Sequence, residues 1–217
     1  MVLLIRNRAN LEEVPKLNKP FKKQFSIPKG YLGRIAGNIM AFENKQLNNW
    51  TLSLLNIAEN DHILEVGYGP GVCMKKILQD YPKVTIHGID VSQTMKEQAE
   101  NRLKEYIEDQ RARIMLGDIE KKKLSSQQYN KVLSVNNYTI WDRPKKVLEK
   151  LYRSMKINGT IAITMQPREE NASTIKTRMF ANQIYRDLSN CGFTNINISY
   201  KRLFPILAVC VTANRTR

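Results

Sequence analysis

From residue 62 onward, short apolar runs alternate with segments of helical periodicity, and this alternation limits the folds open to the chain. Most of the runs are bounded by Gly, Asp or Asn, which is typical of fully buried strands. Strands and helices alternating at this spacing form a mainly parallel sheet covered on both faces, with right-handed crossovers. The sequence therefore predicts an α/β fold with strands at His62–Gly67, Val84–Ile89, Arg113–Leu116, Lys131–Val135 and Thr160–Thr164.

The segments between these runs carry apolar stripes at helical spacing. Charged side chains, Lys150 among them, occupy the other positions and are expected to face solvent. A further helix is expected to begin near Val72. The expected inward positions are Met95, Ala99, Leu103, Tyr106 and Ile107 in one helix, Val147, Leu148, Leu151, Tyr152 and Met155 in a second, and Phe180, Ile184 and Leu188 in a third.

The two ends of the chain depart from this pattern. Thr194–Leu203 and Ile206–Thr212 are β-prone runs joined by a tight turn, so the last strand should run antiparallel. Residues 1–36 are rich in Pro, Lys and Asn and indicate an extended arm. An amphipathic helix follows from about Ile39, with Leu47, Trp50, Leu54 and Ile57 on one face. We expect residues 1–58 to form an arm and helical lid (21–50 covering a pocket, or simply packing on the sheet) and 59–217 to form the main domain.

Composition excludes several classes of protein. The chain has 217 residues, of which 42% are hydrophobic, so it can bury a core and is not globally disordered. No stretch approaches about 18 uncharged apolar residues, so no membrane span is expected. The opening run Val2–Ile5 is too short for a secretory signal, and a cytoplasmic protein is expected. Three scattered cysteines and two histidines, without ligand spacing, predict no metal site and buried free thiols.

The net charge of +15 is concentrated at the two ends of the chain. Residues 61–142 hold twelve basic and twelve acidic groups, whereas residues 143–217 hold fourteen basic and four acidic ones. Such flanks suggest an anionic partner: a phosphorylated or carboxylated substrate, a nucleic acid or an acidic membrane surface. A solvated, solubilising surface is the equally weighted alternative.

The strongest local signal is the segment Ile63–Gly71, in which a buried strand runs into a turn with Gly67, Gly69 and Gly71. Glycine permits positive φ and lets backbone amides approach a ligand closely. The crevice beyond the carboxyl end of such a strand is where doubly wound sheets bind nucleotides. Tyr68, inside this turn, is included among the expected ligand contacts.

Two departures from the dinucleotide fingerprint indicate which nucleoside ligand binds. Val72 stands where G-x-G-x-x-G would place its third glycine, and Glu65 precedes the turn by two residues. A carboxylate there repels a pyrophosphate but suits a cationic group. S-adenosylmethionine (SAM) has a nucleoside, a sulfonium and an amino acid, and it has no phosphate. The sequence therefore favours SAM over NAD.

Further side chains at the ends of the next strands fit the same ligand. Asp90 ends the second strand, where its carboxylate can accept from both ribose hydroxyls. Asp118 follows the third strand and can accept from the adenine amino group, while Ile119 covers the ring. Val91 and Met95 are expected to form the opposite apolar wall. Asn136, after the fourth strand, is expected to contact the cofactor, with Tyr138 and Asp142 as weaker candidates on the substrate side.

On these residues the chain resembles the class I, Rossmann-like SAM-dependent methyltransferases over residues 60–213. The resemblance extends through 132–142 to the small-molecule branch that includes quinone-biosynthesis enzymes, although Ile157-Asn158-Gly159 replaces the usual Pro-Gly-Gly before the fifth strand. It implies a doubly wound, mostly parallel seven-stranded sheet with a C-terminal antiparallel hairpin strand. It also implies in-line methyl transfer to a small molecule, with S-adenosylhomocysteine as product. No general base is evident, and His87 is expected to be a core residue.

Three alternatives remain open at this point. The basic C-terminal third suits an RNA methyltransferase, but Asn136-Asn137-Tyr138 lacks the Asn/Asp-Pro-Pro-Tyr/Phe pattern of base amino methylation. A SAM-binding protein without catalysis is the second alternative. An NAD-dependent oxidoreductase is the third, and Val72 and Glu65 disfavour it.

Overall fold

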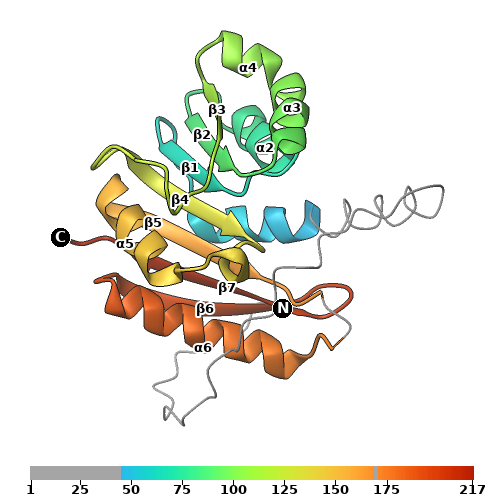
Figure 1. Ribbon diagram of the computed structural model, residues 1–217, viewed down its shortest axis with the longest axis vertical. Helices are drawn as coiled ribbons and strands as arrows, with labels where there is room; N and C mark the ends of the chain where they lie inside the picture. The colour runs from blue at the N-terminus through green and yellow to red at the C-terminus, as the bar shows by residue number, and fades with distance from the viewer. Residues whose placement is uncertain (1–44, 169–170) are drawn as a thin grey trace.

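The computed structural model describes residues 45–168 and 171–217 (Figure 1). The expected arm, and the expected lid up to residue 44, lie outside the described residues. The helix expected from about Ile39 is described over 45–55. It packs on the sheet through Leu47, Trp50 and Leu55, and the Thr51 and Thr164 hydroxyls lie 2.7 Å apart. Leu54 is only half-buried, and Ile57 is buried beyond the helix end.

Within the described ranges, seven strands form one sheet in the order β3-β2-β1-β4-β5-β7-β6. β1, β2, β3, β4 and β5 pair in parallel, whereas β7 is antiparallel to both β5 and β6. This is the Rossmann-like, doubly wound arrangement with a C-terminal antiparallel hairpin, as the sequence predicts. The strands are β1 (His62–Val66), β2 (Thr85–Asp90), β3 (Ala112–Leu116), β4 (Tyr129–Val135), β5 (Met155–Met165), β6 (Thr194–Arg202) and β7 (Leu207–Asn214).

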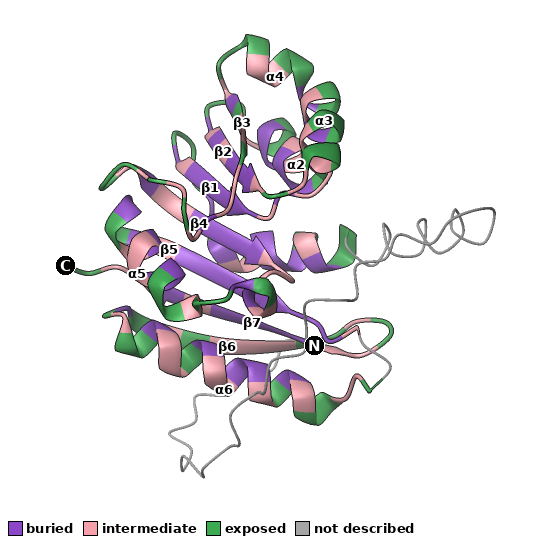
Figure 2. Cartoon of the chain, in the orientation of Figure 1, coloured by how far each residue is buried: buried purple, intermediate pink, exposed green. Residues whose placement is uncertain are grey.

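Helices cover the sheet in two layers, each with its own apolar cluster (Figure 1). One cluster joins the segment 45–55, α2 and α3 to the sheet, and the other joins α5 and α6 to its opposite face. Figure 2 shows the burial concentrated in the central strands and in the inward faces of the helices. The helices are α2 (Val72–Asp80), α3 (Gln93–Arg102), α4 (Lys104–Glu108), α5 (Pro144–Ser154) and α6 (Thr174–Asn190), with a 3-10 turn η2 (Tyr138–Ile140).

Two predicted elements are wrong in their extent. The single helix expected through Leu103 is two helices, because Leu103 leaves helical geometry (φ −109°, ψ 13°) and packs toward Gly71. Tyr106 and Ile107 are consequently only partly buried. Met155, expected on a helix, opens β5, which begins five residues before the predicted strand. Lys156 and Asn158 interrupt the apolar residues at its start, so no continuous apolar run reveals this part of the strand.

The sequence predicts helices over both faces of the sheet, but one crossover connection contains no helix to provide that cover. Residues 117–128, which join β3 to β4, contain turns and no helix in the structure. On the sheet face left open there, His87 Nδ1 lies 3.1 Å from the Tyr129 hydroxyl and His87 Nε2 lies 3.4 Å from His62 Nε2. Burial, then His62 and Arg113, lower the pKa of His87 to about 4. His87 is thus a partnered, neutral residue of the sheet, but it is only partly buried and is not the core residue that was expected.

Across the described residues, no helix has the length and apolar character that crossing a membrane requires. Of the three cysteines expected to be buried, Cys73 and Cys210 are buried but Cys191 is partly exposed; all three are free thiols.

Candidate functional site

The turn between β1 and α2 contains three glycines with positive φ, and the surroundings of each glycine differ. A Cβ on Gly67 would lie 2.2 Å from the Asn137 side chain, so any other residue there would displace Asn137. A Cβ on Gly71 would lie 3.1 Å from Ala99, which keeps the turn close to α3. A Cβ on Gly69 would meet nothing within 4 Å. Gly69 therefore faces open space, and its backbone is accessible to a ligand.

Asn137 fixes this turn to the end of β4. Its side-chain Nδ2 donates to the carbonyls of Val135 (2.7 Å), Val66 (3.1 Å) and, more weakly, Gly67 (3.4 Å). These bonds hold the carboxyl ends of β1 and β4 at the point where the sheet order reverses. The sequence analysis assigned Asn137 no role, because an Asn after a strand is also an ordinary turn residue.

Asp90, at the carboxyl end of β2, faces the same turn. Its Oδ2 accepts from the amide of Gly69 (2.9 Å), and its Oδ1 accepts from the amide of Ser92 (2.9 Å). An ionised carboxylate has about four acceptor positions, so two remain for other donors. Asp90 thus orients the glycine turn and keeps capacity for hydroxyl groups of a ligand.

Glu65 is the unusual group of the site, because a carboxyl at the end of a central strand is only 3% exposed. Burial, followed by the charge of Asp90, raises the pKa of Glu65 to about 8, while a hydrogen bond from the Cys73 thiol opposes the rise. Its Oε2 has no hydrogen-bond partner among the described residues. A buried polar atom without a partner is destabilising, by about 1–3 kcal/mol. Glu65 is therefore suited to a cationic partner that the chain itself does not supply.

The loop after β3 carries the two residues expected beside an adenine. Asp118 Oδ1 accepts from the amide of Glu120 (2.8 Å), which leaves Asp118 Oδ2 facing Lys121 at 3.8 Å. Ile119 is buried at 5% exposure in the core cluster. The structure therefore fixes the position of both residues through the loop backbone.

Lys150 fixes this loop from α5, and its predicted solvent-facing position is wrong. Its Nζ donates to the carbonyls of Ile119 (2.7 Å), Glu120 (2.8 Å) and Lys122 (2.8 Å). Helical periodicity alone placed Lys150 on the outward face, and a side chain that reaches back to a distant loop leaves no signal in that pattern.

The other residues expected at the cofactor differ widely in their exposure to solvent. Val91 is 69% exposed and Met95 is partly buried at the start of α3. Tyr68 is 3% exposed, and its ring packs against Gly88, where a Cβ would lie 2.6 Å from the ring. Tyr68 can therefore contribute its backbone to a ligand, while its ring belongs to the core.

Asn136 and Gln166 meet at the carboxyl ends of β4 and β5. Asn136 Oδ1 accepts from the amide of Gln166 (2.8 Å), and Gln166 Nε2 donates to the carbonyl of Ile206 (2.8 Å). These backbone partners determine which amide atom is oxygen and which is nitrogen in both side chains. The remaining atoms, Asn136 Nδ2 and Gln166 Oε1, are buried without partners among the described residues. The sequence analysis missed Gln166.

Tyr138, considered for the substrate side, and the two histidines have other positions in the structure. The Tyr138 hydroxyl donates to Asp187 on α6, so Tyr138 is a core residue and the prediction of a substrate contact is wrong. Neither histidine of the chain belongs to the glycine turn, since His62 opens β1 and His87 faces His62.

We expect Lys150→Met to weaken SAM binding about three- to tenfold, because the Ile119–Lys122 carbonyls lose their shared donor and the loop becomes mobile. Titration calorimetry measures this change. Lys146→Met on the exposed face of the same helix is the matched control. Equal affinities for wild type and Lys150→Met would show that the loop does not contribute to the site.

Comparisons with known proteins agree with this geometry. A family profile described as "Methyltransferase domain" matches residues 63–159. The chain is 46% identical over 181 residues to the "Uncharacterized methyltransferase YdaC" of Bacillus subtilis (strain 168), covering 83% of this chain and 98% of the relative.

Two solved structures with low sequence identity share the fold. A Haemonchus contortus phosphoethanolamine N-methyltransferase 2, bound to S-adenosylhomocysteine, has a TM-score of 0.65 at 14% identity, covering 78% of this chain and 53% of that one. The geranyl diphosphate C-methyltransferase of Streptomyces coelicolor A3(2), also with S-adenosylhomocysteine, has a TM-score of 0.65 at 13% identity, covering 84% and 83%.

The fold, the glycine turn with its two carboxylates, and these relatives define one class of enzyme. The chain belongs to the class I, Rossmann-like SAM-dependent methyltransferases. Its methyl donor is SAM, and S-adenosylhomocysteine is the product. The narrower resemblance to quinone-biosynthesis enzymes stays a prediction.

Proposed function

We propose that the chain binds SAM across the glycine turn and transfers its methyl group to a small-molecule acceptor at the carboxyl ends of β4 and β5. The observation that carries the proposal is a set of three buried polar atoms without partners among the described residues: Glu65 Oε2, Asn136 Nδ2 and Gln166 Oε1. Glu65 is the penultimate residue of β1, and Asn136 and Gln166 directly follow β4 and β5, so all three lie at the edge where ligands of doubly wound sheets bind.

Each of the cofactor residues has a specific role in this proposal. Glu65 meets the cationic amino acid end, the Gly69 backbone lies against the ligand, and Asp90 accepts from the ribose hydroxyls. Asp118 binds the adenine edge, between Ile119 on one side and Val91 and Met95 on the other. Tyr68, Gly67 and Gly71 shape the turn. Bound SAM supplies a methyl group that its sulfonium has already activated, so the protein's contribution is positioning and exclusion of water.

The acceptor is proposed to be small because the polar atoms available to it are few and close to the strand ends. Asn136, expected from the sequence to contact the cofactor, is proposed here to face the acceptor through its free Nδ2, which can only donate, whereas Gln166 Oε1 can only accept. Together they suit an acceptor that carries both a hydrogen-bond donor and an acceptor oxygen. The chain's positive charge is compatible with an anionic acceptor, and its cytoplasmic location remains a prediction from the sequence.

Asp90→Ala tests the proposed cofactor site. The variant should lose SAM binding by at least about 100-fold, because it removes the ribose acceptor and frees the Gly69 amide. Titration calorimetry with SAM measures the loss, and Asp109→Ala, an exposed carboxylate at the end of α4, is the control. Circular dichroism melting shows whether the fold is retained. A folded Asp90→Ala protein with wild-type affinity would refute the site.

The acceptor class is tested by following S-adenosylhomocysteine production with a panel of small acids, phenols, amines and thiols, and with RNA. We expect turnover with a member of the small-molecule panel, reduced at least about tenfold in Asn136→Asp. That variant keeps the oxygen that accepts from Gln166 and removes the donor. Turnover with RNA and none with the panel would contradict a small acceptor.

A further inference from the structure

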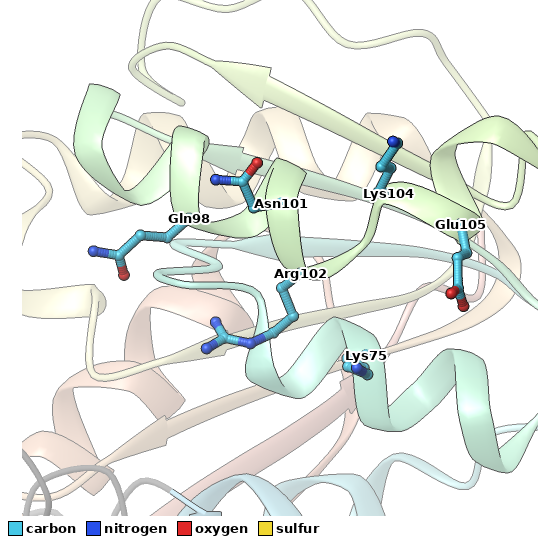
Figure 3. Close-up of a pocket in the computed structure, with 6 residues that line it drawn as sticks. All are labelled: Lys75, Gln98, Asn101, Arg102, Lys104 and Glu105. Atoms are coloured by element: carbon cyan, nitrogen blue, oxygen red, sulfur yellow. The ribbon is translucent and has the colours of Figure 1, made fainter.

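A basic hollow lies on the outer side of α2, away from the sheet. It consists of two adjoining cavities of about 700 and 310 Å³, which share Lys75 of α2 and Arg102 of α3. Figure 3 shows the larger one, with Arg102 extending from α3 toward α2. The smaller one continues along α2 to the segment 45–55. We call the combined hollow, with its cations Lys45, Lys75, Lys76, Arg102 and Lys104, the α2 groove.

The α2 groove has an excess of positive charge that the chain does not neutralise. Five cations line it against one carboxylate, Glu105, and the other polar lining groups are Asn and Gln amides. Lys76 pairs with Asp80 at 2.8 Å, and Lys104 only approaches Glu108 at 3.9 Å. Lys45 and Lys75 have no ion pair or side-chain hydrogen bond within the described parts of the chain. Their mutual repulsion in a concave site is relieved by a bound anion.

We propose that the α2 groove binds a soluble small ligand carrying two or more phosphate groups. Two cavities joined at Lys75 and Arg102 offer cations on both sides of the shared residues, which a single phosphate could not span. Lysine ammonium groups serve as point charges for phosphate, and the amides supply hydrogen bonds to its oxygens or to attached hydroxyls. This site goes beyond the proposed methyl transfer and does not depend on it.

The composition of the groove disfavours other occupants. The N-terminal segment 1–44 carries eight basic and three acidic residues, so like charges oppose its insertion. In the part of the chain that the structure describes, no aromatic side chain lines either cavity for base stacking, on which single-stranded nucleic acid binding depends. The groove is concave and Val72 is its single exposed apolar side chain, which does not suit a membrane surface.

The glycine turn lies next to the α2 groove but contributes no charged side chain to it. Arg102 donates one guanidinium hydrogen bond to the Pro70 carbonyl, and a guanidinium has four further donors for a ligand. Arg102 is therefore left unchanged in the test, because replacing it would disturb the proposed SAM site. Lys45 and Lys75 contribute positive charge to the groove, and neither side chain donates a hydrogen bond to the glycine turn.

The test is titration calorimetry of the full chain with inorganic pyrophosphate and with tripolyphosphate. We expect Lys45→Gln/Lys75→Gln to weaken binding of both at least about tenfold. The control Lys145→Gln/Lys146→Gln removes the same charge from the exposed face of α5 and should change binding less than about twofold. SAM affinity should stay unchanged in the groove variant, and pyrophosphate binding should persist in Asp90→Ala, which separates this site from the proposed cofactor site.

Several outcomes would overturn the proposal. No measurable binding of either probe by wild type would do so, as would equal weakening in the groove and control variants, which indicates general surface charge. A twelve-nucleotide RNA or phosphatidylglycerol vesicles bound in preference to tripolyphosphate, with the same sensitivity to the groove variant, would assign the groove to a macromolecular surface instead.

Discussion

Gly67→Ala is expected to destabilise the protein by about 2–4 kcal/mol, whereas Gly69→Ala is expected to leave it folded and to remove most of its SAM binding. The new Cβ at position 67 would lie 2.2–2.3 Å from the Asn137 side chain. It would displace a group that donates to the carbonyls of Val66 and Val135, so the carboxyl ends of β1 and β4 would lose the link that Asn137 makes between them. Positive φ adds a cost of about 1 kcal/mol at either glycine.

At position 69 the new methyl group meets no atom of residues 45–168 or 171–217 within 4 Å. Its effect on the fold is therefore limited to the left-handed backbone, and its effect on ligand binding follows from occupying the proposed space for SAM. Urea unfolding of the two variants measures the first effect, and titration with SAM measures the second, with at least about a tenfold loss expected for Gly69→Ala. A Gly69→Ala protein that binds SAM as wild type does would place the ligand elsewhere.

The sequence predicted the fold well because its signals are local. Short apolar runs between Gly, Asp and Asn located all of the parallel strands, and β-prone runs either side of Phe204-Pro205 located the hairpin. The failures come where the local signal is weak. The opening of β5, where Lys156 and Asn158 interrupt the apolar residues, hides a strand, and the break at Leu103 reflects packing toward Gly71. Local sequence patterns do not predict how distant segments of the chain pack against one another.

The residues of the candidate site also fall into two groups, those that local sequence signals locate and those that they do not. Glu65, Asp90 and the glycines stand at fixed offsets from strand ends, so the sequence could place them together. Asn137, Lys150 and Gln166 act by donating to carbonyls far along the chain, and such contacts depend on the tertiary structure. The same limit explains why Tyr138 was misassigned, since its partner Asp187 lies 49 residues away on α6.

SAM binding at pH 7 is expected to release close to one proton from Glu65. Burial and Asp90 raise the pKa of this carboxyl to about 8, so it is mostly neutral before the ligand binds. A cationic group placed against Oε2 favours the ionised form and lowers that pKa, which expels the proton. Calorimetry of SAM binding in phosphate and in Tris, whose ionisation enthalpies differ, measures the number of protons released.

The variant Glu65→Gln shows whether the protons released on SAM binding come from Glu65 or from another group. The variant should release none and should bind SAM about 10- to 100-fold more weakly, while adenosine, which lacks the cationic end, should bind both proteins similarly. S-adenosylhomocysteine distinguishes the partner of the carboxylate, because it keeps the ammonium and lacks the sulfonium. We expect it to release the proton as SAM does; release with SAM alone would assign Glu65 to the sulfonium.

The same raised pKa has a consequence for stability without any ligand. A carboxyl whose pKa is higher in the folded state than in the unfolded one stabilises the fold at low pH, and that contribution is lost as pH rises from about 4.5 through about 8. Glu65→Gln stays neutral, so it should match wild type in urea unfolding near pH 5 and exceed it near pH 9. If the two proteins lose stability in parallel over this range, Glu65 is ionised in the free enzyme, and its partner is already present in the fold.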